Sequence, residues 1–419
     1  MASQYKSSDE RIIPVAVPLP ISTAVNDGTI PTAPAARPTL QTANATMSSA
    51  STYNLPTSRR SGVLAPISEQ QISKLVEQGY TRGHAISLAQ TIKNFPLRIW
   101  VVDNSGSMQT ADGHRFVETK RTQDVKVVKC SRWHELRDCI EYHAHMAAAL
   151  EAPTTFRMLN DPGCGPNTQQ FGIAETSLSP GVLQEEVDRA VAIMKSAQPH
   201  GVTPLIQHLE VIQQSVFEIS PTLRADGCRV AIILATDGLP TDMNGNCSET
   251  IQQQFVEALR ALEGLPVWVV IRLCTDEEKV VNFYNNLDGQ LELSLEVLDD
   301  FIEEAKGVHE HNPWLNYALQ LHRLREMGYH HRVFDMMDER PFTHEELREF
   351  CTLLLLHENS SVVELPDPSA DWRLFSNTVK KLLAKQRGQW NPIQKKVTPW
   401  IDIKEMNKIF GTHGRWSLW

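Results

Sequence analysis

The stretch from Leu97 to Met108 reads LRIWVVDNSGSM, and the rest of the chain is organised around it. Its first six residues are mostly apolar and rich in β-branched side chains, which is typical of a central parallel strand buried on both faces. The apolar run stops at Asp103, and Ser105 and Ser107 follow on alternate positions. Gly106 allows a tight turn between the serines. We therefore expect three side-chain oxygens to converge and form half of a hard-cation site.

Two later stretches carry candidates for the other half. Thr203 precedes Pro204 at the predicted start of a helix, where the pair suits an N-cap and the first helical position. Residues 229–237, RVAIILATD, form a second apolar strand that ends in Asp237 and is followed by the turn GLP. Ligands of doubly wound α/β folds bind at the carboxyl ends of the strands, which is where Asp103 and Asp237 are expected.

Five positions together resemble a known metal site. They are, in chain order, Asp103, Ser105, Ser107, Thr203 and Asp237, within the words SGSM, TPL and TDGLPTD. This set is similar to the complete metal ion-dependent adhesion site of the von Willebrand factor A (vWA) family, and is closest to its intracellular branch. The resemblance implies that the serines bind the ion directly, that the threonine binds directly or through water, and that the aspartates often bind through water. It also implies an open coordination position for an Asp or Glu carboxylate of a protein partner.

The expected ligands are hydroxyls and carboxylates only, which selects hard cations. A compact set of oxygens suits Mg²⁺ or Mn²⁺ better than Ca²⁺. The alternative is that the aspartates cap turns and the serines bond the backbone.

Composition narrows the class of protein. The 419 residues carry a net charge of −10, which argues against nucleic acid as the main partner. No apolar run reaches membrane-spanning length and the first residues lack a signal-peptide pattern, so we expect an intracellular, cytoplasmic protein, with the nucleus left open. The seven cysteines are scattered without a CxxC pair, which is typical of reduced thiols rather than a zinc site. Closely spaced histidines such as His143 and His145 diverge on a helix and are not predicted to share a metal.

The order of patterns predicts four regions. Residues 1–65 are rich in Pro, Ser, Thr and Ala and are expected to be disordered, and residues 66–95 to form a small helical hairpin. Residues 96–310 alternate strands with helices, so we expect an α/β domain with a doubly wound, Rossmann-like sheet flanked by helices, as in vWA domains. Residues 311–419 are predicted to be mainly helical, with a basic, Trp-containing tail.

The helical hairpin has two open interpretations. Ser68 and Gln71 form a capping box, and a Gly79-Tyr80 loop separates the two helices. The pattern resembles the first two helices of a ubiquitin-associated (UBA-like) domain, which implies ubiquitin as a partner. The third helix of that domain is missing, because the first strand begins at Leu97. The other interpretation is a hairpin that packs on the next domain, since two short helices bury too little surface to be stable alone.

A second hairpin is predicted beside the metal loop, at residues 115–130. We expect its exposed face to carry Arg115, Lys126 and Lys129 together with Lys120 and Arg121, and so to favour an acidic partner. The alternative is an insertion that only covers the sheet edge. The tryptophans of the C-terminal tail are expected to fold back onto the core, with RNA or anionic lipid binding as the other interpretation.

The favoured function is a non-enzymatic, metal-dependent protein-interaction module. A Mg²⁺-dependent hydrolase is the competing class, with Asp112 or Asp242 as candidate bases. Against it, the sequence has no GxxxxGK[ST] loop, no GxSxG elbow and no HExxH helix.

Overall fold

The computed structural model describes Tyr53 and residues 68–118, 125–358 and 360–411. The expected tail at residues 1–65 lies outside these residues, apart from Tyr53, and so do Lys120 and Arg121. Among the described residues, no helix is both long and apolar enough to cross a membrane.

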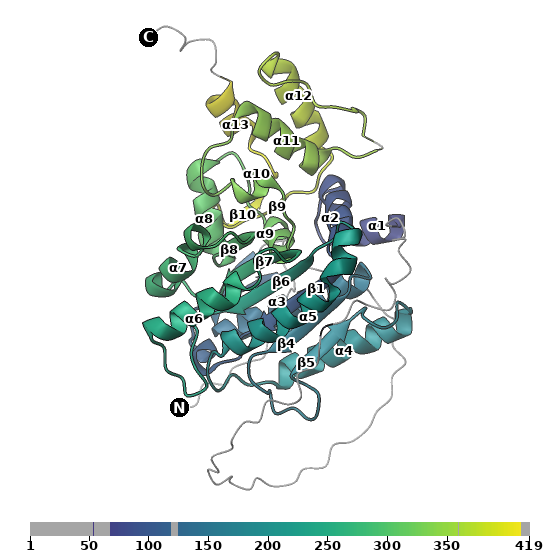
Figure 1. Ribbon diagram of the computed structural model, residues 1–419. Coiled ribbons are helices and arrows are strands. Elements are labelled where there is room, and N and C mark those ends of the chain that lie inside the picture. Colours follow the sequence, from purple (N-terminus) through teal and green to yellow (C-terminus); the bar gives the residue numbers. More distant parts are fainter. Residues whose placement is uncertain (1–52, 54–67, 119–124, 359, 412–419) are drawn as a thin grey trace, which may run out of the picture.

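A six-stranded sheet in the order β5-β4-β1-β6-β7-β8 forms the centre of the molecule (Figure 1). All neighbouring strands run parallel except β5, which is antiparallel to β4. The strands are β1 (Leu97–Val102), β4 (Thr154–Met158), β5 (Gln170–Ile173), β6 (Val230–Thr236), β7 (Val267–Leu273) and β8 (Leu295–Leu298). The predicted α/β class is confirmed as a mostly parallel sheet flanked by helices.

Strand β1 is buried on both faces, as its apolar run predicts. Side chains of a strand alternate between the faces of the sheet. Ile99 and Val101 accordingly pack with α5, α6 and α7, whereas Trp100 and Val102 pack with α3 and α4. The helices that cover the sheet are α3 (Arg132–Ala149), α4 (Pro180–Ser196), α5 (Leu205–Ala225), α6 (Glu249–Arg260) and α7 (Glu278–Asn285).

The C-terminal region is mainly helical and packs against the amino-terminal helices and the sheet domain (Figure 1). Its elements are α8 (Phe301–His311), α9 (Leu319–Glu326), α10 (Arg332–Asp335), α11 (His344–Leu355), α12 (Trp372–Leu383), β9 (Gln389–Asn391), β10 (Lys396–Thr398) and α13 (Ile403–Phe410). Residues 314–318, which precede helix α9, form an irregular segment with a bridge from Leu315 to Ile401. Trp400 is 1 % exposed, so this tryptophan of the tail folds back onto the core as predicted.

The amino-terminal hairpin consists of α1 (Glu69–Glu77) and α2 (Arg82–Asn94), and the capping box at Ser68 is confirmed. Its apolar residues share one core with α3 of the sheet domain and with the C-terminal helices. The Gly79-Tyr80 loop is held from three directions. The Gln389 side chain donates to the Gly79 carbonyl at 2.9 Å, Gln320 donates to the Gln78 carbonyl at 3.1 Å, and the hydroxyls of Tyr80 and Tyr142 lie 2.8 Å apart. The Gly79-Tyr80 loop, which is part of the resemblance to a ubiquitin-associated domain, is therefore packed against residues of α3 and of the C-terminal region.

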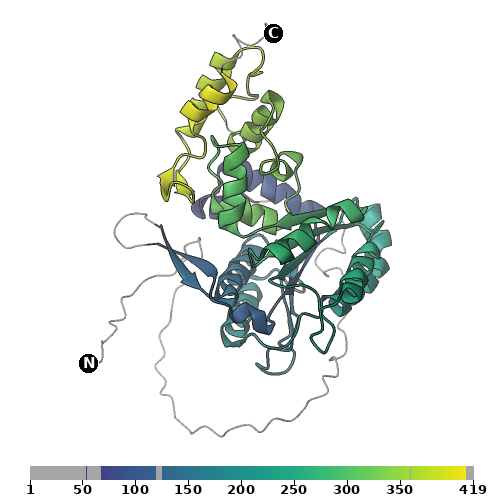
Figure 2. The same cartoon turned by 90° about the vertical axis from the view of Figure 1, so that its left-hand side faces the viewer.

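The strands β2 (Gly113–Glu118) and β3 (Val125–Cys130) form the predicted hairpin, which projects from the body of the molecule (Figure 2). The expected single basic face is wrong. Lys126 lies opposite Val117 and Lys129 lies opposite His114, so the two lysines point to different faces. Arg115 is not part of an exposed basic face, because its guanidinium forms an ion pair with two hydrogen bonds to Asp138 on α3.

Candidate functional site

Two aspartates lie side by side where the central strands end. Asp103 follows β1, and its amide donates to the Ala235 carbonyl of β6 at 2.9 Å. Asp237 follows β6, the next strand in the sheet. Their exposed fractions are 0 % and 1 %. The sheet topology thus brings two carboxylates that are 134 positions apart in sequence to one carboxyl edge.

A chain of hydrogen bonds joins these aspartates to the predicted serines. The Ser105 amide donates to Asp103 Oδ1 at 2.8 Å, and the Ser105 and Ser107 hydroxyls lie 3.0 Å apart. The Ser107 hydroxyl in turn donates to Asp237 Oδ1 at 2.7 Å. Thr236, the first residue of the TDGLPTD word but not one of the five predicted ligands, donates from its Oγ1 to Asp103 Oδ2 at 2.6 Å. Four of the five predicted residues therefore form one connected cluster of oxygens.

The loop of Thr203 lies against this cluster. Its neighbour Gly201 accepts a hydrogen bond from the Gly106 amide at 3.2 Å, in the turn between the two serines. The Thr203 hydroxyl faces Gly238, since a Cβ added to that glycine would lie 3.9 Å from it. Thr203 is not the N-cap of α5, contrary to the sequence prediction. Pro204, in a non-helical conformation, is the residue that precedes the first helical residue, Leu205, and so stands at the N-cap in place of Thr203.

We call the five residues Asp103, Ser105, Ser107, Thr203 and Asp237 the sheet-edge cluster. Burial and then the neighbouring Asp237 carboxylate raise the pKa of Asp103 to about 6. Burial also raises the pKa of Asp237, against hydrogen bonds from Ser107 and Arg132 that favour its charged form. Two buried carboxylates in contact with hydroxyls are stabilised by a cation, and a set made only of oxygen donors fits Mg²⁺ or Mn²⁺.

Arg132 is a residue of this site that sequence reasoning missed. It is the first residue of α3, and its Nη1 donates to Asp237 Oδ2 at 3.0 Å. Its Nε and Nη2 donate to the two oxygens of Asp112 at 2.8 and 2.6 Å. No local motif indicates this contact, because Arg132 is 105 positions from Asp237. The guanidinium supplies a fixed positive charge at one side of the cluster.

The two candidate bases of the hydrolase interpretation, Asp112 and Asp242, both accept hydrogen bonds that lower their pKa values. The hydrogen bonds from Arg132 lower the pKa of Asp112. Asp242 accepts from the amides of Asn244 and Asn246 within its own loop, and its hydrogen bonds with Asn246 lower its pKa. A general base works best with a pKa near the operating pH, so both carboxylates are poor candidates.

Compared with known proteins, the sequence matches no protein-family model and no curated protein.

Proposed function

We propose that residues 96–310 form a vWA-type domain that acts as a metal-dependent protein-interaction module. In this proposal the sheet-edge cluster holds a Mg²⁺ or Mn²⁺ ion, and an Asp or Glu carboxylate of a protein partner completes the coordination of that ion. The observation that carries the proposal is the connected chain of oxygens from Asp103 through the two serines to Asp237 at the carboxyl edge of the sheet.

The charges of the cluster explain why an outside carboxylate would be accepted. Asp103 and Asp237 together carry two negative charges, and Arg132 already neutralises part of the charge on Asp237. The three hydroxyl ligands are neutral. A bound divalent ion would supply an electrophilic position that is not fully neutralised by the protein, and a partner carboxylate satisfies it.

The ion-binding part of the proposal is tested with Mn²⁺ as the probe. Electron paramagnetic resonance of the free ion should reveal one saturable site in the wild-type chain, and Mg²⁺ should compete for it. Asp237→Ala should weaken Mn²⁺ binding by at least about tenfold, since it removes a ligand outright. Asp226→Ala is the matched control, because Asp226 is exposed at the far end of α5. Wild-type protein without saturable binding at millimolar Mn²⁺ would refute the proposal.

The interaction part is tested by capture from a cell lysate on the immobilised chain. We expect a partner that is retained with Mg²⁺, is released by a chelator and is not retained by Asp103→Ala. Capture that is equal with and without Mg²⁺ would show that any interaction uses another surface.

A further inference from the structure

A second polar cluster lies in the interior, between α3 of the sheet domain and α9 of the C-terminal region. At its centre is the carboxylate of Glu326, whose side chain is 0 % exposed. Cys139 and His143 of α3 face this carboxylate, and His322 of α9 lies beside it. We call Cys139, His143, His322 and Glu326 the interhelix cluster.

The four residues come in two pairs with helical spacing. Cys139 and His143 are four positions apart on α3, and His322 and Glu326 are four positions apart on α9. Residues at this spacing share one face of a helix. Each helix therefore presents two metal-binding side chains to the other. His145, two positions beyond His143, is exposed, as the divergence of the i and i+2 positions predicts.

Two distances within the cluster suit a tetrahedral ion, whereas His143 Nε2 and Glu326 Oε2 lie 2.9 Å apart, at hydrogen-bond distance. The ligand atoms of Cys139, His143 and Glu326 all lie within 4.8 Å of one another. Glu326 Oε1 is 3.5 Å from Cys139 Sγ and 3.4 Å from His322 Nε2. Tetrahedral zinc, with Zn–S of about 2.3 Å and Zn–N or Zn–O of about 2.0–2.1 Å, separates neighbouring ligand atoms by roughly 3.3–3.5 Å.

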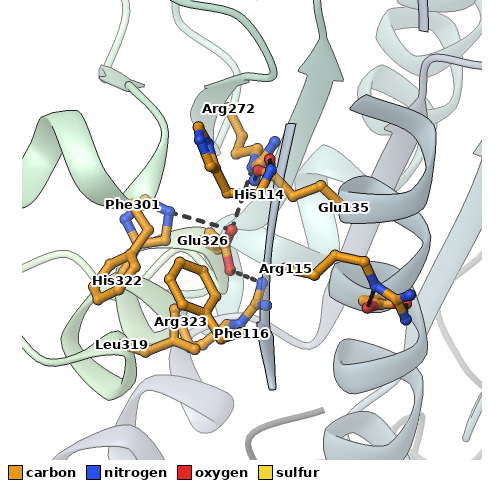
Figure 3. A pocket seen from close by; sticks show the side chains of 11 residues that line it. His114, Arg115, Phe116, Glu135, Arg272, Phe301, Leu319, His322, Arg323 and Glu326 are labelled. Carbon is orange, nitrogen blue, oxygen red and sulfur yellow. Dashed lines mark hydrogen bonds and ion pairs between the residues drawn. The ribbon is translucent and has the colours of Figure 1, made fainter. Parts of the chain in front are cut away.

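The Nε2 atom of His322 is buried and makes no hydrogen bond of good geometry among the described residues, although an unsatisfied buried polar atom is costly. It lies 3.4 Å from Glu326 Oε1, the contact drawn in Figure 3. His322 and Glu326 also line a narrow cavity of about 30 Å³, which continues past Glu135 to the β2–β3 hairpin (Figure 3). The cavity gives a small ion or a water molecule room beside these ligands.

Two guanidiniums complete the surroundings. Arg323 Nη1 donates to Glu326 Oε2 at 2.7 Å, and Arg272 pairs with Glu135 while its Nε lies 3.4 Å from Glu326 Oε1. Two carboxylates, Glu135 and Glu326, thus balance the two guanidiniums.

We propose that the interhelix cluster is a structural site for a zinc-type ion, with the Cys139 thiolate, the imidazoles of His143 and His322, and the Glu326 carboxylate as ligands. Cys139 releases its proton on binding, so the ion and the thiolate together add one positive charge to the cluster. Sulfur and imidazole ligands select Zn²⁺ over Mg²⁺, and four protein ligands leave no open position for a substrate. The bound ion joins the C-terminal region to the sheet domain.

The test uses Co²⁺ alone as the probe, on the full chain after removal of metals. Tetrahedral Co²⁺ with a thiolate ligand gives a ligand-to-metal charge-transfer absorption, which should saturate at one ion per chain and disappear on addition of Zn²⁺. Cys139→Ser should abolish this absorption. His143→Gln keeps the thiol and should weaken Co²⁺ binding by at least about tenfold. It serves as the second variant in case Cys139→Ser does not fold.

Two controls separate the possible outcomes. Cys351→Ser removes another fully buried thiol, in α11, and should leave the absorption unchanged. Asp103→Ala should also leave it unchanged, because this proposal is independent of the sheet-edge cluster. Absence of the absorption in the wild type, or its persistence at full strength in both Cys139→Ser and His143→Gln, would overturn the proposal.

Discussion

The sheet-edge cluster and the interhelix cluster differ in how the fold builds them. The first is formed by loops that follow parallel strands, and its donors are all oxygens. The second is formed by the facing sides of two helices, and its donors are sulfur, nitrogen and oxygen. Loops at a sheet edge can meet a partner from outside, whereas an interface between helices is closed by its own packing. The comparison teaches that one chain can separate a site suited to recognition from a site suited to holding its parts together.

The largest expected effect is the loss of the central carboxylate of the interhelix cluster. Glu326→Ala leaves the guanidiniums of Arg272 and Arg323 buried without their shared partner, and should destabilise the protein by about 3–5 kcal/mol. Urea unfolding in the presence of a chelator measures this cost without any contribution from metal. Glu364→Ala is the control, since that side chain is 78 % exposed and pairs with Arg348, and it should cost less than about 1 kcal/mol. Equal costs would mean that the buried network contributes little.

The second prediction concerns His84, where burial alone shifts the pKa of an imidazole. His84 is fully buried among Phe334, Phe350 and Trp400, and burial lowers its pKa to about 3. The unfolded chain binds a proton near pH 6.5 and the folded chain does not, so stability present above pH 6.5 is lost as the pH falls toward 3. Between about pH 7.5 and pH 4.5 the loss from this residue should be about 3 kcal/mol.

Replacement of His84 by leucine should remove this part of the pH dependence. The measurement is the difference in unfolding free energy between wild type and His84→Leu across the same pH range. A difference that stays constant with pH would show that His84 takes up a proton in the folded state.

Replacement of Arg132, which lies beside the sheet-edge cluster, is expected to strengthen ion binding by a smaller amount. Arg132 Nη1 lies 3.0 Å from an oxygen of Asp237, so its charge opposes a cation at the same carboxylate. Arg132→Gln should tighten Mn²⁺ binding by about tenfold, which corresponds to about 1.4 kcal/mol. Arg137→Gln is the control, because Arg137 lies on α3 and its ion pairs are with Asp138 and Glu141. Weaker binding in Arg132→Gln would instead assign Arg132 the role of positioning Asp237.

The smallest effect is expected on the projecting hairpin. Lys126 and Lys129 are exposed on opposite faces, so a partner that approaches the sheet-edge cluster along one face meets only one of them. Replacing that lysine by glutamate should slow association about two- to threefold at low salt, and less at high salt. Association rates of the captured partner with Lys126→Glu and Lys129→Glu measure this. Equal rates for both variants and the wild type would exclude the hairpin from recognition.

The sequence predicts the sheet and the sheet-edge residues because their signals are local. An apolar strand followed within five residues by one aspartate and two serines can be read directly, and the second apolar strand ends in Asp237 in the same way. The prediction of Thr203 as an N-cap was wrong because a proline can stand before a helix as well as at its first position. The prediction of one basic face on the β2–β3 hairpin was wrong because Lys126 and Lys129 are three positions apart in a strand, which places them on opposite sides.

The interhelix cluster and Arg132 could not be predicted in the same way. Cys139 and Glu326 are 187 positions apart, and nothing near either residue specifies that α3 and α9 pack together. The available signal was the spacing of four within each pair, Cys139 with His143 and His322 with Glu326. Spacing identifies a helix face, but only the tertiary fold identifies which two faces meet.

The covered loop between α1 and α2 has a consequence for synthesis of the chain. The hairpin leaves the ribosome early, yet Gln320 and Gln389, which hold its loop, come 242 and 310 residues after the carbonyls that they bind, a delay of roughly 12–60 s at 5–20 residues per second. The sheet can close in the meantime, because its last strand ends at Leu298. The apolar side of the hairpin, with Leu75 and Leu88, can meet α3 by then but must wait for its partners in the C-terminal region. A chaperone that shields nascent helices would therefore act on this protein at its amino-terminal end, before the C-terminal region exists.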